Sequence, residues 1–379
     1  MHVLVGIPCL LRGGTEIQTL YLVRALVLFG WKVTVLCYFE YDRQVVDEYS
    51  SAGGNVILMK LDRSLGHIAF VRVLRKEIAG QKPDVMHVQY MTPGALAILA
   101  ARLAGLRRVY ATVHQPYSSW HSPLWKILLR LSAPLCDYFI SVSLTTEMSW
   151  FGRCRNITDI SGYKLPGHFT LHNAVDIARV RLLVESGEAD ALKDRYGLKS
   201  GFVFGFIGRL SDEKGLDVLF EAFELLVQRH QSVNLLVIGD GPEKATLLQR
   251  YGRRTWWKMV RMPGRLSWEE AMRHFSAMDV AVVPSRFEGF GLSAVEAMAA
   301  SIPVIASDAG GLAEVIEDGH SGLLFERGNA VALCSEMVRL LTEPEFRKKL
   351  VLGASKRVWS FDISRFNDNI LKIYKVIEK

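Results

Sequence analysis

The chain has 379 residues, half of them apolar, and a formal net charge of +7. Such a length favours two globular domains, and the uncharged apolar runs fall short of the roughly 18 residues that span a bilayer, which argues against a transmembrane helix. No helix-turn-helix, zinc-finger or RNP-type pattern accompanies the basic residues, so nucleic acid is not an expected partner.

The first part of the chain alternates short apolar strands with helical patterns. A strand HVLVGI is followed by a helix from about Glu16 to Phe29 and then by the strand KVTVLCYF. The series continues through DVMHVQ, RRVYATVH and DYFISVS, with helical stretches between them. This alternation predicts βαβ units and a parallel sheet with helices on both faces.

Two loops that follow these strands are candidate ligand contacts, because open α/β sheets bind ligands at the carboxyl ends of their strands. Gly13 and Gly14 follow the first strand and allow close approach of a ligand to the backbone. Their loop fits neither G-x-G-x-x-G nor the P-loop pattern, and a simple turn explains it equally well. His114 ends a strand, and it is either functional or an ordinary surface or core histidine.

The net charge lies entirely in this first part of the chain. Residues 1–172 carry 18 Lys and Arg against 11 Asp and Glu. Within them, residues 123–135 place Lys126 and Arg130 among leucines and a tryptophan at helical spacing. Such a segment suits an anionic membrane surface, and it equally suits an ordinary helix packed on its own sheet with two solvated cations.

A second series of strands begins after a stretch with little periodicity. Its strands are GFVFGFIGRL, VNLLVIGDGP, KMVRMPG, DVAVVPS and IPVIASD, each followed by a helix-like stretch. We therefore predict two doubly wound α/β domains, at residues 1–172 and 173–360. Residues 361–379 form an amphipathic helix that must dock on another element.

The cysteines are odd in number and widely spaced, without a C-x-x-C pair. This spacing argues against a disulfide framework or a zinc site and favours reduced thiols in the cytosol. The cysteines are Cys9, Cys37, Cys136, Cys154 and Cys334.

Arg209 and Lys214 lie in the loop GRLSDEKG, which follows a strand and precedes a helix. Two cations at a helix N-terminus oppose the preference of the helix dipole for anions, and a diphosphate ligand would offset that cost. The alternative is surface pairing with Asp212 and Glu213, which contributes little to stability.

The segment SRFEGFGLSAVEAMAAS sets Glu288 and Glu296 eight positions apart around a glycine-rich turn. A strand precedes this turn and a helix follows it, so Glu288 lies in the loop and Glu296 about one turn into the helix. The first N–H groups of that helix attract phosphate, whereas carboxylates accept hydrogen bonds from sugar hydroxyls. The combination suggests a sugar nucleotide, and two solvated glutamates explain the pair by itself equally well.

Taken in order along the chain, these segments resemble the retaining GT-B glycosyltransferases of glycosyltransferase family 4, also called group 1. The resemblance runs from GGTEIQ through HNAVD, GRLSDEKG and PGRLS to DGHSGLLF, and its specific part is the pattern E-x7-E. It implies two Rossmann-like domains that face a central cleft, with the helix at about 361–379 packed back onto the first domain. Ala174 departs from the pattern, because the family's linker usually has glycine there.

The resemblance also implies roles for the candidate residues. Glu296 would bind the ribose of a donor nucleotide, and Glu288 the hydroxyls of the transferred sugar. Arg209 and Lys214 would hold the diphosphate and stabilise its charge as the glycosidic bond breaks. His114 would face the donor sugar. The other donor-binding positions are Gly13, Gly14, Gly264, Arg265, Phe290, Gly291 and Leu292.

The implied function is that of a retaining hexosyltransferase, which moves a sugar from a nucleotide-diphosphate sugar to a glycan or lipid-linked acceptor in cell-surface polysaccharide or glycolipid synthesis. The sequence contains no D-x-D tripeptide, so we expect neither a metal nor a cofactor. We expect a cytoplasmic protein that is peripheral on the inner face of the membrane. The alternatives are a GT-B-type sugar-nucleotide epimerase and a non-catalytic sugar-nucleotide-binding protein.

Overall fold

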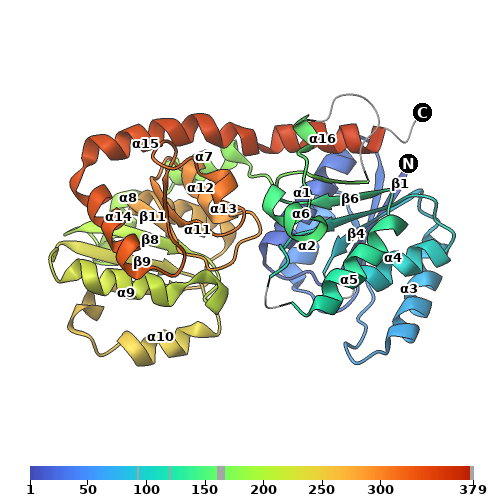
Figure 1. Cartoon of the computed structure of the whole chain (residues 1–379), viewed down its shortest axis with the longest axis horizontal. Helices are drawn as coiled ribbons and strands as arrows, with labels where there is room; N and C mark the ends of the chain where they lie inside the picture. The colour runs from blue at the N-terminus through green and yellow to red at the C-terminus, as the bar shows by residue number, and fades with distance from the viewer. Residues whose placement is uncertain (92–93, 119–120, 160–166, 376–379) are drawn as a thin grey trace. The chain divides into compact units, whose positions relative to one another are not determined.

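The computed structural model describes residues 1–91, 94–118, 121–159 and 167–375. The chain divides into two compact units: Met1–Ala174 with Ile363–Lys379, and Val175–Asp362. The junctions placed from the sequence, after residues 172 and 360, each lie two residues before those of the structure. The C-terminal helix belongs to the first unit (Figure 1).

The first unit is built on a seven-stranded parallel sheet with the order β3-β2-β1-β4-β5-β6-β7. The chain winds outward from β1 in one direction and then returns to continue in the other, which is the doubly wound arrangement that the sequence predicts. Its strands are β1 (His2–Ile7), β2 (Lys32–Cys37), β3 (Asn55–Leu58), β4 (Val85–Tyr90), β5 (Val109–Val113), β6 (Tyr138–Ser141) and β7 (His168–Thr170).

Helices cover both faces of this sheet, and each face has its own apolar core. One core takes side chains from α1, α2 and α16, and the other from α3, α4, α5 and α6. The helices are α1 (Gly14–Leu28), α2 (Arg43–Ser51), α3 (His67–Gln81), α4 (Gly94–Leu103), α5 (Pro123–Ser132), α6 (Leu144–Phe151) and α16 (Ile363–Lys375), and the short 3-10 turn η1 (Ala133–Leu135) follows α5.

The C-terminal helix α16 is part of the first core. Its side chains Phe366, Ile370 and Ile373 pack into the cluster that α1 lines. The Tyr374 hydroxyl lies 2.7 Å from Nδ1 of the buried His87 on β4. The apolar side of α16 therefore packs within the first unit, and residues 376–379 of the predicted helix lie outside the described residues.

The second unit is built on a six-stranded parallel sheet with the order β10-β9-β8-β11-β12-β13. Its helices also lie on both faces, so the prediction of two doubly wound parallel sheets is confirmed. The strands are β8 (Phe202–Ile207), β9 (Val233–Ile238), β10 (Val260–Gly264), β11 (Val280–Val283), β12 (Val304–Ser307) and β13 (Leu323–Phe325). The helices are α7 (Ile177–Glu185), α8 (Ala189–Arg195), α9 (Leu216–Val227), α10 (Glu243–Tyr251), α11 (Trp268–His274), α12 (Leu292–Ala299), α13 (Leu312–Val315), α14 (Ala330–Thr342) and α15 (Pro344–Arg357), with 3-10 turns including η3 (Asp212–Lys214) and η6 (Val358–Phe361).

The structure differs from the sequence-based elements at a few places. The strands β3, β7 and β13 were not predicted, because each has only three or four residues and lies at an edge of its sheet. Between the two sheets the chain forms two separate helices, α7 and α8. They are separated at Gly187, where a Cβ would lie 2.6 Å from the Arg273 carbonyl oxygen, and at Glu188, which has a φ of +45°.

Candidate functional site

Most of the predicted site residues follow strands of the second sheet. Arg209 comes two residues after β8, Gly264 ends β10, and Glu288 lies in the loop between β11 and α12. Because the strands are parallel, their carboxyl ends meet at one edge of the sheet. The structure therefore gathers these residues at the edge where open α/β sheets bind ligands.

Glu288 is half-buried and lies at the centre of a short polar network. Its Oε2 accepts a hydrogen bond from Lys214 Nζ at 2.7 Å and another from Ser285 Oγ at 3.1 Å. Lys214 comes from η3, which follows β8, so the contact joins two neighbouring strand ends. The alternative in which Lys214 pairs with its sequence neighbours Asp212 and Glu213 is not the observed pairing.

The loop that carries Glu288 is shaped by a glycine pair that our sequence reasoning did not assign to the site. Gly310 and Gly311 follow β12, and a Cβ on Gly310 would lie 2.1 Å from the Glu288 carbonyl oxygen. A Cβ on Gly311 would lie 2.5 Å from the Phe290 Cα, and Gly311 N–H donates to the Glu288 carbonyl at 3.1 Å. The signal was present, because a Gly-Gly pair after a strand is the pattern that singled out Gly13 and Gly14.

Glu296 lies about one turn into α12, as predicted, and is only 9% exposed. Its Oε1 accepts a hydrogen bond from the Trp268 indole N–H at 2.8 Å. Burial raises the pKa of Glu296 to about 7, and the hydrogen bond from Trp268 opposes that rise. A carboxyl group with this pKa can both accept hydrogen bonds from hydroxyl groups and donate to them near neutral pH. The sequence reasoning missed Trp268, which lies four residues after Gly264.

The N-terminus of α12 is formed by the predicted residues Phe290, Gly291 and Leu292. The Phe290 ring is buried and packs edge-to-face on Phe361, with centroids 5.4 Å apart, so only its backbone can face a ligand. Gly291 caps the helix at a φ of +106°, and its carbonyl accepts from Ala294 N–H at 3.0 Å. The first N–H groups of a helix have no partner within the helix, which makes this end of α12 suitable for an anion.

Arg209 and Arg265 are both exposed at the same edge of the sheet. Among the described residues, no ion pair involves the Arg209 guanidinium, in contrast to the paired Lys214. Gly264 has a φ of +88°, a Cβ added there would meet no atom within 4 Å, and its carbonyl accepts from Gly239 N–H at 2.9 Å. At least one strand separates each of these residues from Glu288 along the chain, so their grouping depends on the fold.

His114 belongs to the first unit and follows β5. Its Nε2 lies 2.7 Å from the Gln89 side-chain oxygen, and burial lowers its pKa to about 4. The imidazole is therefore neutral at physiological pH, and Nε2 donates to Gln89, which leaves Nδ1 as the acceptor. His114 and Gln89 line a small cavity together with His87 and Asn173.

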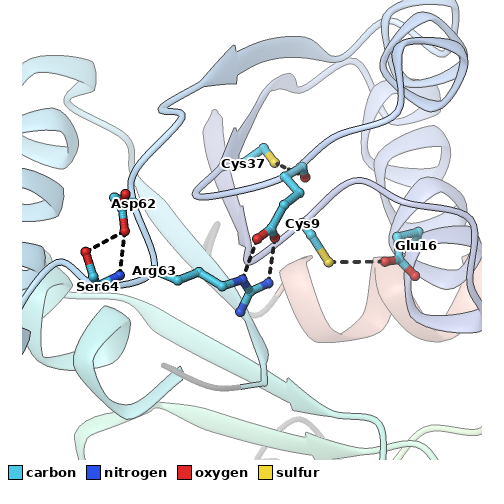
Figure 2. Close-up of polar contacts among 7 residues, drawn as sticks. Cys9, Glu16, Cys37, Asp62, Arg63 and Ser64 are labelled. Atoms are coloured by element: carbon cyan, nitrogen blue, oxygen red, sulfur yellow. Dashed lines mark hydrogen bonds and ion pairs between the residues drawn. The ribbon is translucent and has the colours of Figure 1, made fainter.

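Gly13 and Gly14 begin α1, and the carboxylate of Glu16 lies over their loop. A Cβ on Gly13 would lie 2.6 Å from Glu16 Oε2, and the Cys9 thiol lies 3.5 Å from Glu16 Oε1 (Figure 2). Burial raises the pKa of Cys9 to about 12, so the neutral thiol donates to the carboxylate. The Glu16 carboxylate therefore occupies the space beside Gly13 that a ligand was expected to approach, and the sequence reasoning did not foresee this.

Comparison with known proteins identifies similar sequences and folds. The family described as Glycosyl transferases group 1 matches residues 188–357, and the family described as Glycosyltransferase Family 4 matches residues 12–151. The alpha-D-kanosaminyltransferase of Streptomyces kanamyceticus is 29% identical over 49% of the chain and 48% of that protein, so the matched part spans about half the length of that relative.

Other relatives match over nearly their full length. The phosphatidyl-myo-inositol mannosyltransferase of Mycolicibacterium smegmatis is 26% identical over 96% of the chain and 90% of that protein. Among solved structures, Anabaena Alr3699/HepE in complex with UDP has a TM-score of 0.83 at 20% identity, covering 99% of the chain and 100% of that protein. At this identity, the structural likeness establishes a shared fold.

Proposed function

The chain belongs to the group 1, family 4-type glycosyltransferases and has the GT-B fold, and we propose that it transfers a hexose from a nucleotide-diphosphate sugar with retention of anomeric configuration. The proposed acceptor is a glycan or a lipid-linked molecule used in cell-surface polysaccharide or glycolipid synthesis. The proposed location is the cytoplasm, at the inner face of the membrane. The observation that carries the proposal is the Lys214–Glu288 contact beside the N-terminus of α12.

This contact suits a donor site better than acid–base catalysis. One oxygen of the Glu288 carboxylate is already occupied by the ammonium group of Lys214 at 2.7 Å, and its other oxygen can accept hydrogen bonds from hydroxyl groups. Glu288 is therefore suited to bind hydroxyl groups of the transferred sugar. Lys214 and the exposed Arg209 add two positive charges, which match the charge of a diphosphate.

The second carboxyl group, Glu296, is suited to the nucleoside end of the donor. It is buried, lies on the same helix whose N-terminus faces the phosphate position, and accepts from Trp268. A ribose offers two neighbouring hydroxyl groups, which a carboxyl group can bind together. The proposed donor is supported by the relative solved in complex with UDP and by its further complex with UDP-glucose.

The proposal includes a metal-independent reaction. Charge develops on the diphosphate as the glycosidic bond breaks, and a divalent cation is one way to stabilise it. Arg209, Lys214 and the N–H groups at the start of α12 supply positive charge at the same edge of the sheet. The leaving phosphate can then take the proton of the acceptor hydroxyl, so no side-chain base is assigned.

The donor is tested by incubating the protein with UDP-, GDP- and ADP-sugars and measuring release of the nucleoside diphosphate. We expect turnover with one class, and Glu288→Ala or the double substitution Arg209→Ala with Lys214→Ala should reduce it by about a hundredfold or more. Lys348→Ala serves as the control, because that lysine is exposed on α15. Near-normal turnover in either site variant would overturn the site assignment.

Two further readouts separate the proposal from its alternatives. Nuclear magnetic resonance of the product should show the anomeric configuration of the donor, and an inverted product would overturn retention. An epimerase would instead convert the sugar nucleotide without releasing nucleoside diphosphate in step with product. A protein that binds the donor with unchanged affinity after Glu288→Ala and turns nothing over would fit the non-catalytic alternative.

A further inference from the structure

The helix α5 of the first unit has an apolar outer face. Leu124, Ile127 and Leu131 are 58%, 54% and 68% exposed, whereas Leu129 is fully buried against the sheet. At 3.6 residues per turn, these three leucine and isoleucine positions lie on the side of the helix opposite Leu129. An ordinary surface helix buries its apolar side and exposes a polar side. The exposed side of α5 is apolar instead.

The elements that contact α5 also expose large apolar side chains. α5 contacts α4, η1 and α6, and it lies beside α4 in Figure 1. Leu103 on α4, Leu135 on η1 and Met148 on α6 are each more than a third exposed. Exposed apolar side chains on several adjoining elements indicate a binding surface rather than scattered exposure.

The sequence interval that contains α5 carries charge of one sign. The sequence contains no Asp or Glu between Asp84 and Asp137, and it contains five Lys and Arg in that interval. Two of them, Lys126 and Arg130, lie one turn apart on one side of α5. Lys126 Nζ lies 4.6 Å from the centre of the Tyr117 ring, and Arg130 Nε donates to the Trp150 carbonyl at 2.8 Å, so both side chains are positioned beside the apolar face.

We propose that α5 and its apolar neighbours bind the surface of an anionic lipid bilayer, with α5 lying in the plane of the interface. The apolar side chains would enter the boundary between headgroups and acyl chains, and Lys126 and Arg130 would meet the lipid phosphates. Among the described residues, no helix has the length and apolar character required to cross a membrane. The proposed contact therefore involves a helix of ten residues lying along the surface.

The charge pattern favours lipid over a second copy of the chain. A symmetric dimer through α5 would place the same surface on both sides of the contact, and it would bring cations against cations with no acidic residue of the interval to offset them. A bilayer with acidic headgroups supplies both an apolar layer and negative charge. Binding of α5 to a membrane is a property separate from the proposed transfer reaction. Because vesicle binding is measured without donor or acceptor, a failure of membrane binding can be told apart from a failure of the transfer reaction.

The test is flotation of the full chain with vesicles of phosphatidylcholine alone or of phosphatidylcholine with phosphatidylglycerol. We expect binding to the anionic vesicles, weaker binding as salt is raised, and little binding to phosphatidylcholine alone. The double substitution Ile127→Glu with Leu131→Glu should reduce binding by about tenfold or more, because it places charge in the apolar layer. Both positions are exposed, so the variant should keep the melting temperature of the unmodified chain.

The control carries the same change at equally exposed positions of the second unit. Leu182→Glu with Leu352→Glu replaces side chains that are 66% and 65% exposed and should leave vesicle binding unchanged. Equal binding to both kinds of vesicle, or no loss in the α5 variant, would overturn the proposal. A dimer that is seen in sedimentation and is lost in the α5 variant would also overturn it, because the surface would then bind a second copy of the chain. Binding to poly-glutamate without binding to vesicles would overturn it as well, because the surface would then bind an acidic protein.

Discussion

Trp268 and Glu296 are joined by a hydrogen bond from the indole N–H to the buried carboxyl group, at 2.8 Å. The contact links the start of α11 to the middle of α12, so two helices that follow different strands fix the position of one carboxyl group. Burial raises the pKa of that group to about 7, and the hydrogen bond from Trp268 offsets only part of the rise. Its position and its ionisation both affect what it can bind.

Glu296→Gln should stabilise the fold at neutral and higher pH. In the unfolded chain this carboxyl ionises near its ordinary pKa of 4.5, whereas in the fold it ionises only at about 7, so its contribution to stability falls as pH rises through that window. The amide carries no charge and removes this loss, which should make the variant more stable by about 1–3 kcal/mol above the window. Urea unfolding at several pH values, from below 4.5 to above 7, measures the free energy of unfolding of both proteins. Glu345→Gln, at an exposed site, is the control, and parallel pH curves for Glu296→Gln and the unmodified chain would contradict the expectation.

Trp268→Phe should weaken donor binding through the same carboxyl group. The indole N–H favours the ionised form of Glu296, so its loss should raise the pKa of Glu296 further. We expect the KM for the donor to rise about tenfold near neutral pH, with a smaller rise at higher pH, where Glu296 is ionised in both proteins. Trp359→Phe is the control, since that indole is exposed on η6. A KM effect independent of pH would show that Trp268 acts through packing alone.

Lys214 and Glu288 should behave as a coupled pair. Their side chains are 22% and 14% exposed, so removing either one leaves a partly buried charge without its partner. The loss of stability in Lys214→Ala with Glu288→Ala should be smaller than the sum of the single losses by about 1–2 kcal/mol. The exposed Lys348–Glu345 pair should show coupling below about 0.5 kcal/mol in the same cycle. Additive losses at Lys214 and Glu288 would mean that the contact adds nothing to the folded protein.

The predictions from the sequence were most accurate where the signal is local. Runs such as DVAVVPS combine apolar, β-branched residues over a whole strand, and the glycine-rich turn after them places Glu288 and Glu296 without knowledge of the rest of the fold. The edge strands β3 and β13, with four and three residues, are too short to give such a signal.

Contacts between distant segments could not be predicted in this way. Trp268 is 28 residues from Glu296, and Lys214 is 74 residues from Glu288. Lys214 and Glu288 meet because they follow β8 and β11, which are neighbours in the sheet, whereas Trp268 and Glu296 lie on helices that follow β10 and β11, two strands that are not adjacent. Neither strand order nor helix packing is a property of a single segment. The sequence identified Lys214 and Glu288 as separate candidates, and the fold provides their contact.

Tyr374→Phe should destabilise the first unit. The Tyr374 hydroxyl lies 2.7 Å from Nδ1 of His87, and both residues are buried. Removing the hydroxyl leaves the ring nitrogen without this partner, which should cost about 1–3 kcal/mol in the free energy of unfolding. Tyr41→Phe is the control, because the Tyr41 ring is only partly buried and keeps its contact with Lys60. Equal stability of the two variants would show that the hydrogen bond does not help to attach α16.

Gly310→Ala should impair both the fold and turnover, whereas Gly328→Ala should affect the fold alone. Both glycines have a positive φ, of +54° and +79°, so alanine at either position costs about 1–2 kcal/mol in backbone strain. Only at Gly310 does the new Cβ also meet a backbone atom, the Glu288 carbonyl oxygen, at 2.1 Å; at Gly328 there is no atom within 4 Å. Relief of that clash must move the Glu288 loop, so Gly310→Ala should lose additional stability and reduce donor turnover by about tenfold or more. Turnover equal to that of Gly328→Ala would mean that the loop keeps its active position without the support of Gly310.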